Sequence, residues 1–238
     1  MNSLTQPVAA GQTLLIDADD TLWENNIYFE RAITNFISFL NHREFTPEQV
    51  RHVLFDVERE SIRHHGYGMQ SFAVSLVKCF EQLSVEPLTP ALHDTIRGFA
   101  FAIAEHPMEI LPEVAETLPH LAERHRLFLM TKGDVLEQTG KFERSGLKQH
   151  FTAVEVVAEK NTSTYKAVVE KHALVREQTW MIGNSPSSDI NPALEAGLHA
   201  VFVPHRNTWE LERGEVRPEI GTGQLLQVSS FGHLRDLF

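Results

Sequence analysis

After residue 108, short apolar runs alternate with segments that have the spacing of amphipathic helices. Apolar runs of this length, bounded by turn residues, indicate buried strands. The predicted strands are RLFLMT (126–131), FTAVEVV (151–157), TWMIG (179–183) and HAVFVP (199–204). The predicted helices cover residues 112–125, 134–145, 162–173 and 187–196. This βαβα order predicts a mostly parallel sheet with helices on both faces.

The segment 24–108 has a different pattern, because its apolar residues recur at helical spacing and no strand is evident. Two of its helices are expected around residues 26–41 and 69–83. Two more begin at Thr46 and Thr89, since each is followed by proline, the pattern of an N-cap before a first helical proline. The sequence therefore predicts about four helices here.

One further buried strand, Gln12–Asp17, precedes the helical segment; its TLLI run shows no polar alternation. We predict two domains from this order: a Rossmann-like α/β core of residues 1–22 and 109–238, and an all-helical cap of residues 23–108. Ligands of open α/β sheets bind beyond the carboxyl ends of the strands. An insertion that leaves that end of the first strand is therefore expected to act as a lid.

Composition excludes several classes of protein. The chain has 238 residues, a net charge of −11 and one cysteine, Cys79. Acidic chains gain nothing from polyanionic backbones, so nucleic acid is not an expected partner. A single cysteine excludes a disulfide within the chain and fits a reducing compartment. We find neither a secretory signal nor an apolar run that could cross a membrane, so a cytoplasmic location is expected.

Polar residues that can carry chemistry follow four of the predicted strands, at the point where each strand ends. In chain order they are Asp17 and Asp19, then Thr131, Lys132 and Gly133, then Lys160, then Asn184 and Asp189. A calcium-binding EF-hand loop does not explain the first group, because Leu22 and Tyr28 stand where that loop needs glycine and glutamate. Paired carboxylates at a strand end can share a metal ion or divide nucleophile and acid/base roles.

These four junctions resemble the four motifs of the haloacid dehalogenase (HAD) superfamily. DADDT (17–21) is similar to its first motif, a strand followed by DxDx[TV]. Thr131 matches the second, Lys160 the third, and GNSPSSD (183–189) the acidic loop of the fourth. The resemblance covers the whole core, and the helical insertion stands where that superfamily has its C1-type cap.

The resemblance implies a role for each matched residue. Asp17 is expected to be a nucleophile that forms an aspartyl-phosphate, and Asp19 the acid/base that protonates the leaving oxygen and then activates water. Phosphate oxygens are expected to contact Thr131, Lys160 and the backbone N–H groups near Lys132 and Gly133. The implied cofactor is Mg²⁺, which prefers hard oxygen ligands. Its implied ligands are Asp17, the backbone carbonyl of Asp19, and Asp189, with Asn184 as a candidate ligand.

Three positions depart from the superfamily's pattern. Asn184 stands where aspartate is frequent; an amide can still bind the metal or orient its water, but it removes a negative charge and should weaken Mg²⁺ binding. Lys132 replaces asparagine and either contacts phosphate or points to solvent. Asn161, rather than proline, follows Lys160. Lys166 competes with Lys160 for its role, but Lys166 falls inside a predicted helix.

The favoured function is a Mg²⁺-dependent phosphohydrolase whose substrate is a small phosphorylated metabolite. Asp19 favours phosphate chemistry over C–Cl cleavage, because the superfamily's dehalogenases lack a second aspartate at this spacing. A phosphomutase remains open, and so does a binding module that has lost turnover, which Asn184 alone supports. His64–Gly68 is expected to be a plain loop between two helices, and His205–Trp209, after the last predicted core strand, either borders the site or has a structural role.

Overall fold

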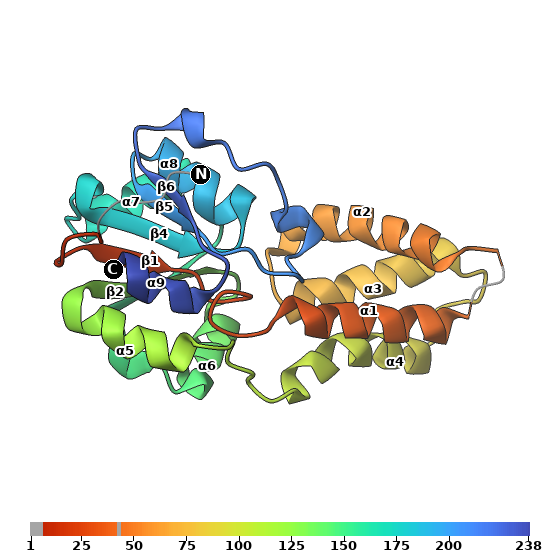
Figure 1. The fold of residues 1–238 in the computed structure, drawn as a ribbon. Helices are drawn as coiled ribbons and strands as arrows, with labels where there is room; N and C mark the ends of the chain where they lie inside the picture. Colours follow the sequence, from red (N-terminus) through yellow and green to blue (C-terminus); the bar gives the residue numbers. More distant parts are fainter. Residues whose placement is uncertain (1–6, 42–43) are drawn as a thin grey trace. The chain divides into compact units, whose positions relative to one another are not determined.

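The computed structural model describes residues 7–41 and 44–238, and Figure 1 shows its fold. The chain divides into two compact units. The first comprises Met1–Asn26 and Met108–Phe238, and the second is the segment between them, Ile27–Pro107. We call them the α/β unit and the helical unit, and each is described by itself.

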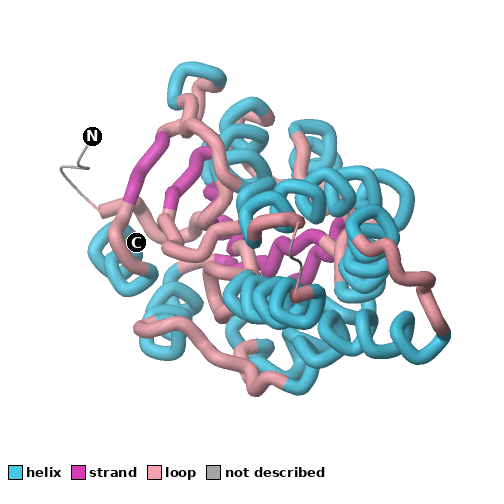
Figure 2. The backbone as a smooth tube through the Cα atoms, turned by 90° about the vertical axis from the view of Figure 1, so that its right-hand side faces the viewer, coloured by secondary structure: helices cyan, strands magenta, loops and turns pink. Residues whose placement is uncertain are grey.

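The described part of the α/β unit contains a six-stranded sheet in the order β3-β2-β1-β4-β5-β6, in which every pair of neighbours is parallel. Figure 2 shows its strands in magenta. The strands are β1 (Thr13–Ile16), β2 (Arg126–Lys132), β3 (Ala153–Val157), β4 (Thr179–Gly183), β5 (His199–Phe202) and β6 (Leu225–Gln227). This order confirms the predicted Rossmann-like α/β fold, and its topological switch lies at β1. The sequence did not predict β6.

Helices cover both faces of the sheet because successive side chains of a strand point to opposite sides. Leu14 and Ile16 of β1 pack in one core with α5 (Val114–Arg124), α6 (Val135–Ser145) and α9 (Leu234–Leu237). Leu15, between them in sequence, packs in another core with α7 (Thr162–Lys171) and α8 (Asn191–Glu195). Both faces of β1 are therefore buried away from solvent, as expected for a strand with an uninterrupted apolar run.

The helical unit has its own core. Its helices are α1 (Asn26–Leu40), α2 (Pro47–His65), α3 (Met69–Leu83) and α4 (Pro90–Phe101), followed by the 3₁₀ turn Ala102–Glu105. The side chains of Thr46 and Thr89 accept hydrogen bonds from the helix starts as N-caps. Cys79 is fully buried, and burial raises the pKa of its thiol to about 12. No described helix has the length and apolar character that crossing a lipid bilayer requires.

The chain leaves and re-enters the α/β unit at neighbouring positions. The N–H of Glu24 donates to the carbonyl of Glu109 (2.9 Å), and the N–H of Leu111 donates to the carbonyl of Leu22 (3.0 Å). Between these bonds, Trp23 and Ile110 form an antiparallel bridge. The two connecting segments are thus fastened to each other before the helical unit begins.

Candidate active site

A buried lysine joins two aspartates at the carboxyl ends of the central strands. Nζ of Lys160, after β3, donates to Oδ1 of Asp17, after β1 (2.5 Å), and to Oδ1 of Asp189, after β4 (2.8 Å). The Lys160 side chain is 2% exposed. Three residues from distant parts of the sequence thus meet where parallel strands end, as the junction pattern predicts.

Backbone packing fixes the two aspartates beside each other. The N–H of Asp17 donates to the carbonyl of Ile182 in β4 (2.9 Å), so Asp17 continues the β1–β4 pairing beyond the end of the strand. Gly183 follows Ile182, and a methyl group in its place would overlap with the Asp189 carboxylate. Glycine is required here for the close approach of that carboxylate. Oδ2 of Asp189 also accepts a hydrogen bond from the N–H of Ser185 (2.9 Å).

The electrostatics of this trio favour added positive charge. Burial raises the pKa of Asp17 to about 7, although Lys160 opposes the shift, and burial likewise raises the pKa of Asp189. Burial alone would lower the pKa of Lys160, but the two carboxylates raise it above its usual value. When ionised, two carboxylates and one ammonium sum to a charge of −1. The site therefore attracts either a proton or a cation.

Asp19 faces a different set of partners from Asp17. Its carboxylate accepts hydrogen bonds from Nε1 of Trp23 (2.7 Å), from Nε2 of Gln138 (3.0 Å) and from Nζ of Lys141 (3.0 and 3.1 Å). Burial would raise the pKa of Asp19, but Lys141 and the neutral donors lower it below its ordinary value. Asp19 is thus held as a carboxylate by α6 and by the indole ring.

The residues after β2 are tied into the same region. Oγ1 of Thr131 donates to Oε1 of Gln138 (3.2 Å), which connects the threonine to Asp19 through one amide. Nζ of Lys132 donates to Oγ of Ser188 (2.9 Å) and forms ion pairs with Glu159 and Glu212. The N–H of Gly133, at φ 135°, donates to the carbonyl of Val157 in β3 (3.0 Å).

Asn184 is buried, and both ends of its amide have partners. Its Oδ1 contacts Oγ1 of Thr21 (3.3 Å), and its Nδ2 donates to Oγ1 of Thr208 (3.0 Å). The same Thr21 hydroxyl lies 2.9 Å from Oδ2 of Asp17. The Thr21 hydroxyl therefore links the amide oxygen of Asn184 to the Asp17 carboxylate. The amide nitrogen of Asn184 is held by Thr208, in the loop after β5.

These residues fit a magnesium ion by the chemistry of their donors. Mg²⁺ takes oxygen ligands, and the side chains of Asp17, Asp189 and Asn184 all offer one. The two carboxylates contact the same ammonium nitrogen, so they lie close enough to share one ion. The negative charge of the trio is what a bound dication would offset.

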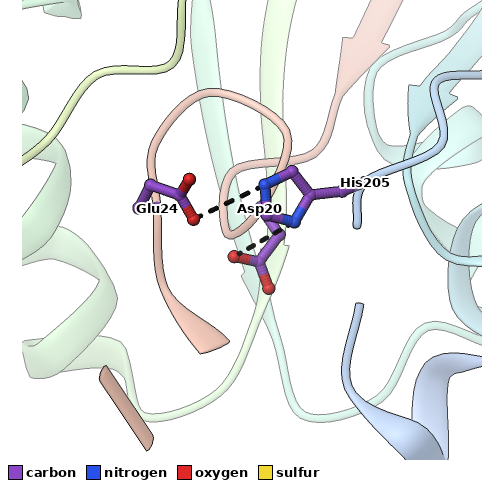
Figure 3. Close-up of side chains that lie close together, drawn as sticks. All are labelled: Asp20, Glu24 and His205. Carbon is purple, nitrogen blue, oxygen red and sulfur yellow. Dashed lines mark ion pairs between the residues drawn. The ribbon is translucent and has the colours of Figure 1, made fainter. Parts of the chain in front are cut away.

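A second cluster of titratable groups lies in the same unit and consists of Asp20, Glu24 and His205. Asp20 is followed four residues later by Glu24, and both carboxylates form ion pairs with the ring of His205, from the loop after β5 (Figure 3). Burial raises the pKa of Asp20 to about 7 and lowers the pKa of His205. The segment His205–Trp209 borders this region, because His205 contacts Asp20 and Thr208 contacts Asn184.

Three residues that contact Asp19 were not singled out from the sequence. Trp23 lies four residues beyond Asp19, while Gln138 and Lys141 lie three apart on α6 and so share one face of that helix. That i, i+3 pair of polar residues follows directly after the Thr131 junction. The pair has the same polar pattern as a solvated helix surface, so no local signal in the sequence marks it.

Several solved structures have a similar fold. The chain is similar to a haloacid dehalogenase-like family hydrolase from Xanthomonas campestris, with 29% identity and a TM-score of 0.79 over 97% of this chain and 93% of that one. YfnB from Bacillus subtilis, described as a HAD hydrolase and solved bound to magnesium, shows 19% identity and a TM-score of 0.65 over 94% and 97%. L-2-haloacid dehalogenase from Xanthobacter autotrophicus shows 16% identity and a TM-score of 0.62 over 94% and 97%. No curated protein matches the sequence significantly.

The family of the chain is identified from its sequence. Residues 12–197 match the family described as haloacid dehalogenase-like hydrolase. This match covers most of the chain and includes each of the four strand-end junctions. The chain therefore belongs to the haloacid dehalogenase-like hydrolases.

Proposed function

We propose that this chain is a Mg²⁺-dependent phosphohydrolase that cleaves a small phosphomonoester through a phosphoenzyme on Asp17. The observation that carries the proposal is the contact of Lys160 with both Asp17 and Asp189 at the carboxyl edge of the sheet. A nucleophilic carboxylate, a phosphate-binding ammonium and a metal-binding carboxylate are the three groups that this reaction needs.

In the first half of the reaction, an oxygen of Asp17 attacks phosphorus and the bond from phosphorus to the ester oxygen breaks. Lys160 and the hydroxyl of Thr131 would hold the phosphoryl oxygens in place. Mg²⁺, held by Asp17, Asp189 and Asn184, would neutralise negative charge on the transferred group. Oδ2 of Asp17 already contacts the Thr21 hydroxyl, which orients the carboxylate so that Oδ1 faces Lys160.

Asp19 would transfer the protons. A proton taken up from solvent before the first step would pass from Asp19 to the departing ester oxygen, and the resulting carboxylate would take one from the water that attacks the phosphoenzyme, which releases phosphate and restores Asp17. The base form is the one that Lys141 stabilises, because the ammonium lowers the pKa of Asp19. Lys141 and Gln138 are therefore positioning residues of the proposed reaction.

The presence of Asp19 helps to distinguish between two candidate activities, phosphate hydrolysis and dehalogenation. A dehalogenase forms and hydrolyses an ester on one aspartate and has no ester oxygen to protonate. Donors from Trp23, Gln138 and Lys141 hold the carboxyl group of Asp19 in one position, from which it could protonate such an oxygen after taking up a proton. This supports hydrolysis of a phosphomonoester over C–Cl cleavage.

The proposal is tested with p-nitrophenyl phosphate and a panel of phosphorylated metabolites, with and without Mg²⁺. We expect Mg²⁺-dependent release of phosphate, and at least a thousandfold loss of kcat in Asp17→Asn, since the nucleophile is removed. Asp236→Asn, an exposed aspartate on α9, is the matched control and should retain full activity. No activity on any phosphomonoester, or equal activity in Asp17→Asn, would reject the proposal.

A further inference from the structure

We propose that Asp20, Glu24 and His205 form a binding site for a divalent transition-metal ion such as Zn²⁺, separate from the Mg²⁺ site proposed at Asp17. The inference does not depend on the proposed function, because it concerns other side chains and another kind of ligand set. It rests on three observations: the geometry of the cluster, its burial, and a carboxylate oxygen in it that lacks a hydrogen bond.

The three side chains converge from two loops. Each offers one ligand atom, and these atoms all lie within 4.8 Å of one another. Oε2 of Glu24 lies 3.5 Å from Nε2 of His205, and Oδ1 of Asp20 lies 3.8 Å from its Nδ1. Figure 3 shows both carboxylates facing the nitrogen atoms of the imidazole ring. Small side-chain rotations would suffice to bring one atom of each residue onto a common ion.

The cluster is buried, and its negative charge is only partly offset by its neighbours. The side chains of Asp20, Glu24 and His205 are only 6%, 9% and 12% exposed. Among the described residues, Oε2 of Glu24 has no hydrogen-bond partner. The guanidinium of Arg206 lies 3.9 Å from the other oxygen of Glu24, but the Arg206 side chain is 77% exposed, so it offsets little of the charge. A buried carboxylate oxygen without a donor favours a bound cation.

The ligand set selects the kind of ion. One imidazole nitrogen and two carboxylate oxygens suit Zn²⁺, which takes nitrogen and oxygen ligands in tetrahedral sites with a water in the remaining position. Mg²⁺ prefers oxygen alone, as the Asp17 site offers. The two sites are therefore expected to bind different ions.

Existing hydrogen bonds to Asp20 and His205 oppose metal binding, because a bound ion would have to replace some of them. Oδ1 of Asp20 already accepts hydrogen bonds from the N–H groups of Asn25 and Asn26 (2.9 and 3.1 Å), whereas its Oδ2 accepts only a longer one from the N–H of Asn26 (3.3 Å), which makes Oδ2 the better ligand. Nδ1 of His205 accepts a long hydrogen bond from the N–H of Asn207 (3.3 Å), so an ion bound at Nδ1 replaces that bond. Such a long bond is weak, and the exchange costs little.

The test is calorimetric titration of the full chain with Zn²⁺ in the presence of excess Mg²⁺. We expect one equivalent of Zn²⁺ to bind. His205→Gln and Glu24→Gln should each weaken the affinity at least tenfold, since even outer partners of metal ligands contribute a factor of about 10 to 100. Glu24→Gln also leaves the His205–Asn207 bond intact, so it serves as the second variant if His205→Gln does not fold.

Two control variants identify where Zn²⁺ binds. His64→Gln removes an exposed histidine that also pairs with a glutamate, Glu60 (2.8 Å), and should leave the titration unchanged. Asp189→Asn removes a carboxylate of the Asp17 site and should also leave it unchanged. The proposal is overturned if the chain binds no Zn²⁺, if Glu24→Gln and His205→Gln bind it as wild type does, or if Asp189→Asn alone abolishes binding.

Discussion

Replacing Lys141 with methionine is expected to slow the proposed reaction at the step that needs Asp19 as a base. Nζ of Lys141 donates to both carboxylate oxygens of Asp19 and to Oδ1 of Asn25 (2.8 Å), and its side chain is 12% exposed. Methionine has a similar length and can fill the same space, but it carries no charge. The ammonium is the main opponent of burial in setting the pKa of Asp19.

The magnitude follows from the kind of contact that is lost. A hydrogen bond to a charged group contributes about 1.5–3 kcal/mol. If the contact contributes this much to placing the carboxylate for water attack, losing it lowers kcat by about 10- to 150-fold. The pKa of Asp19 rises, because burial then dominates, so the carboxylate is protonated at higher pH. The acidic limb of the kcat–pH profile should therefore move toward neutral pH.

The assay is steady-state hydrolysis of p-nitrophenyl phosphate from pH 5 to 9, together with acid-quenched measurement of phosphoenzyme. Lys141→Met should accumulate more phosphoenzyme than wild type, and Lys141→Arg should restore most of the rate because it restores the charge. Lys148→Met is the matched control, since Lys148 pairs with Glu143 on the surface at 65% exposure. A folded Lys141→Met protein with the pH profile and phosphoenzyme level of wild type would refute the reasoning.

Three further predictions concern other parts of the chain. Gly183→Ala forces its new methyl group onto the Asp189 carboxylate and should lower both Mg²⁺ affinity and kcat at least tenfold, measured by calorimetry and turnover. Asn184→Asp adds a carboxylate to the trio and should tighten Mg²⁺ binding roughly tenfold while lowering the melting temperature of the metal-free protein. Glu58→Gln tests the helical unit: burial raises the pKa of Glu58 to about 8 from 4.5, so wild type loses stability as pH rises through that range. In denaturant titrations, the decline in the free energy of unfolding from pH 5 to pH 9 should be smaller in Glu58→Gln than in wild type by up to about 5 kcal/mol; equal pH dependence in both proteins would contradict this prediction.

Much of the fold could be predicted because its signals are local. The uninterrupted apolar run of β1 indicates a strand covered on both faces, and Leu14 and Leu15 indeed pack into different cores. The Thr-Pro pairs at Thr46 and Thr89 predict helix starts for the same reason, since the capping hydroxyl acts within one turn. β6 escaped prediction because three residues, Leu225–Gln227, carry too little pattern to distinguish a strand from a loop.

Some residues of the candidate site could also be predicted from the sequence, and others could not. Asp17, Lys160 and Asp189 could be expected to meet, because the topology of a parallel sheet brings all strand ends to one edge. Their catalytic roles remain a prediction. The partners of Asp19 could not be foreseen, since a glutamine and a lysine in a polar helix turn have the same pattern as a solvated surface. The approach of His205 to Glu24 likewise depends on the path of two loops, which no local pattern encodes.

The hydrogen bonds between Leu22–Glu24 and Glu109–Leu111 affect how the sequence of this chain can change in evolution. Two segments that are hydrogen-bonded to each other at the base of an insertion hold the ends of that insertion together. The structure of the sheet therefore does not depend on how many residues the insertion contains. Closing a longer loop costs only a fraction of a kcal/mol more. Residues can therefore be gained, lost or exchanged between the two fastened segments while the β1–β4 register that carries Asp17 and Asp189 stays the same.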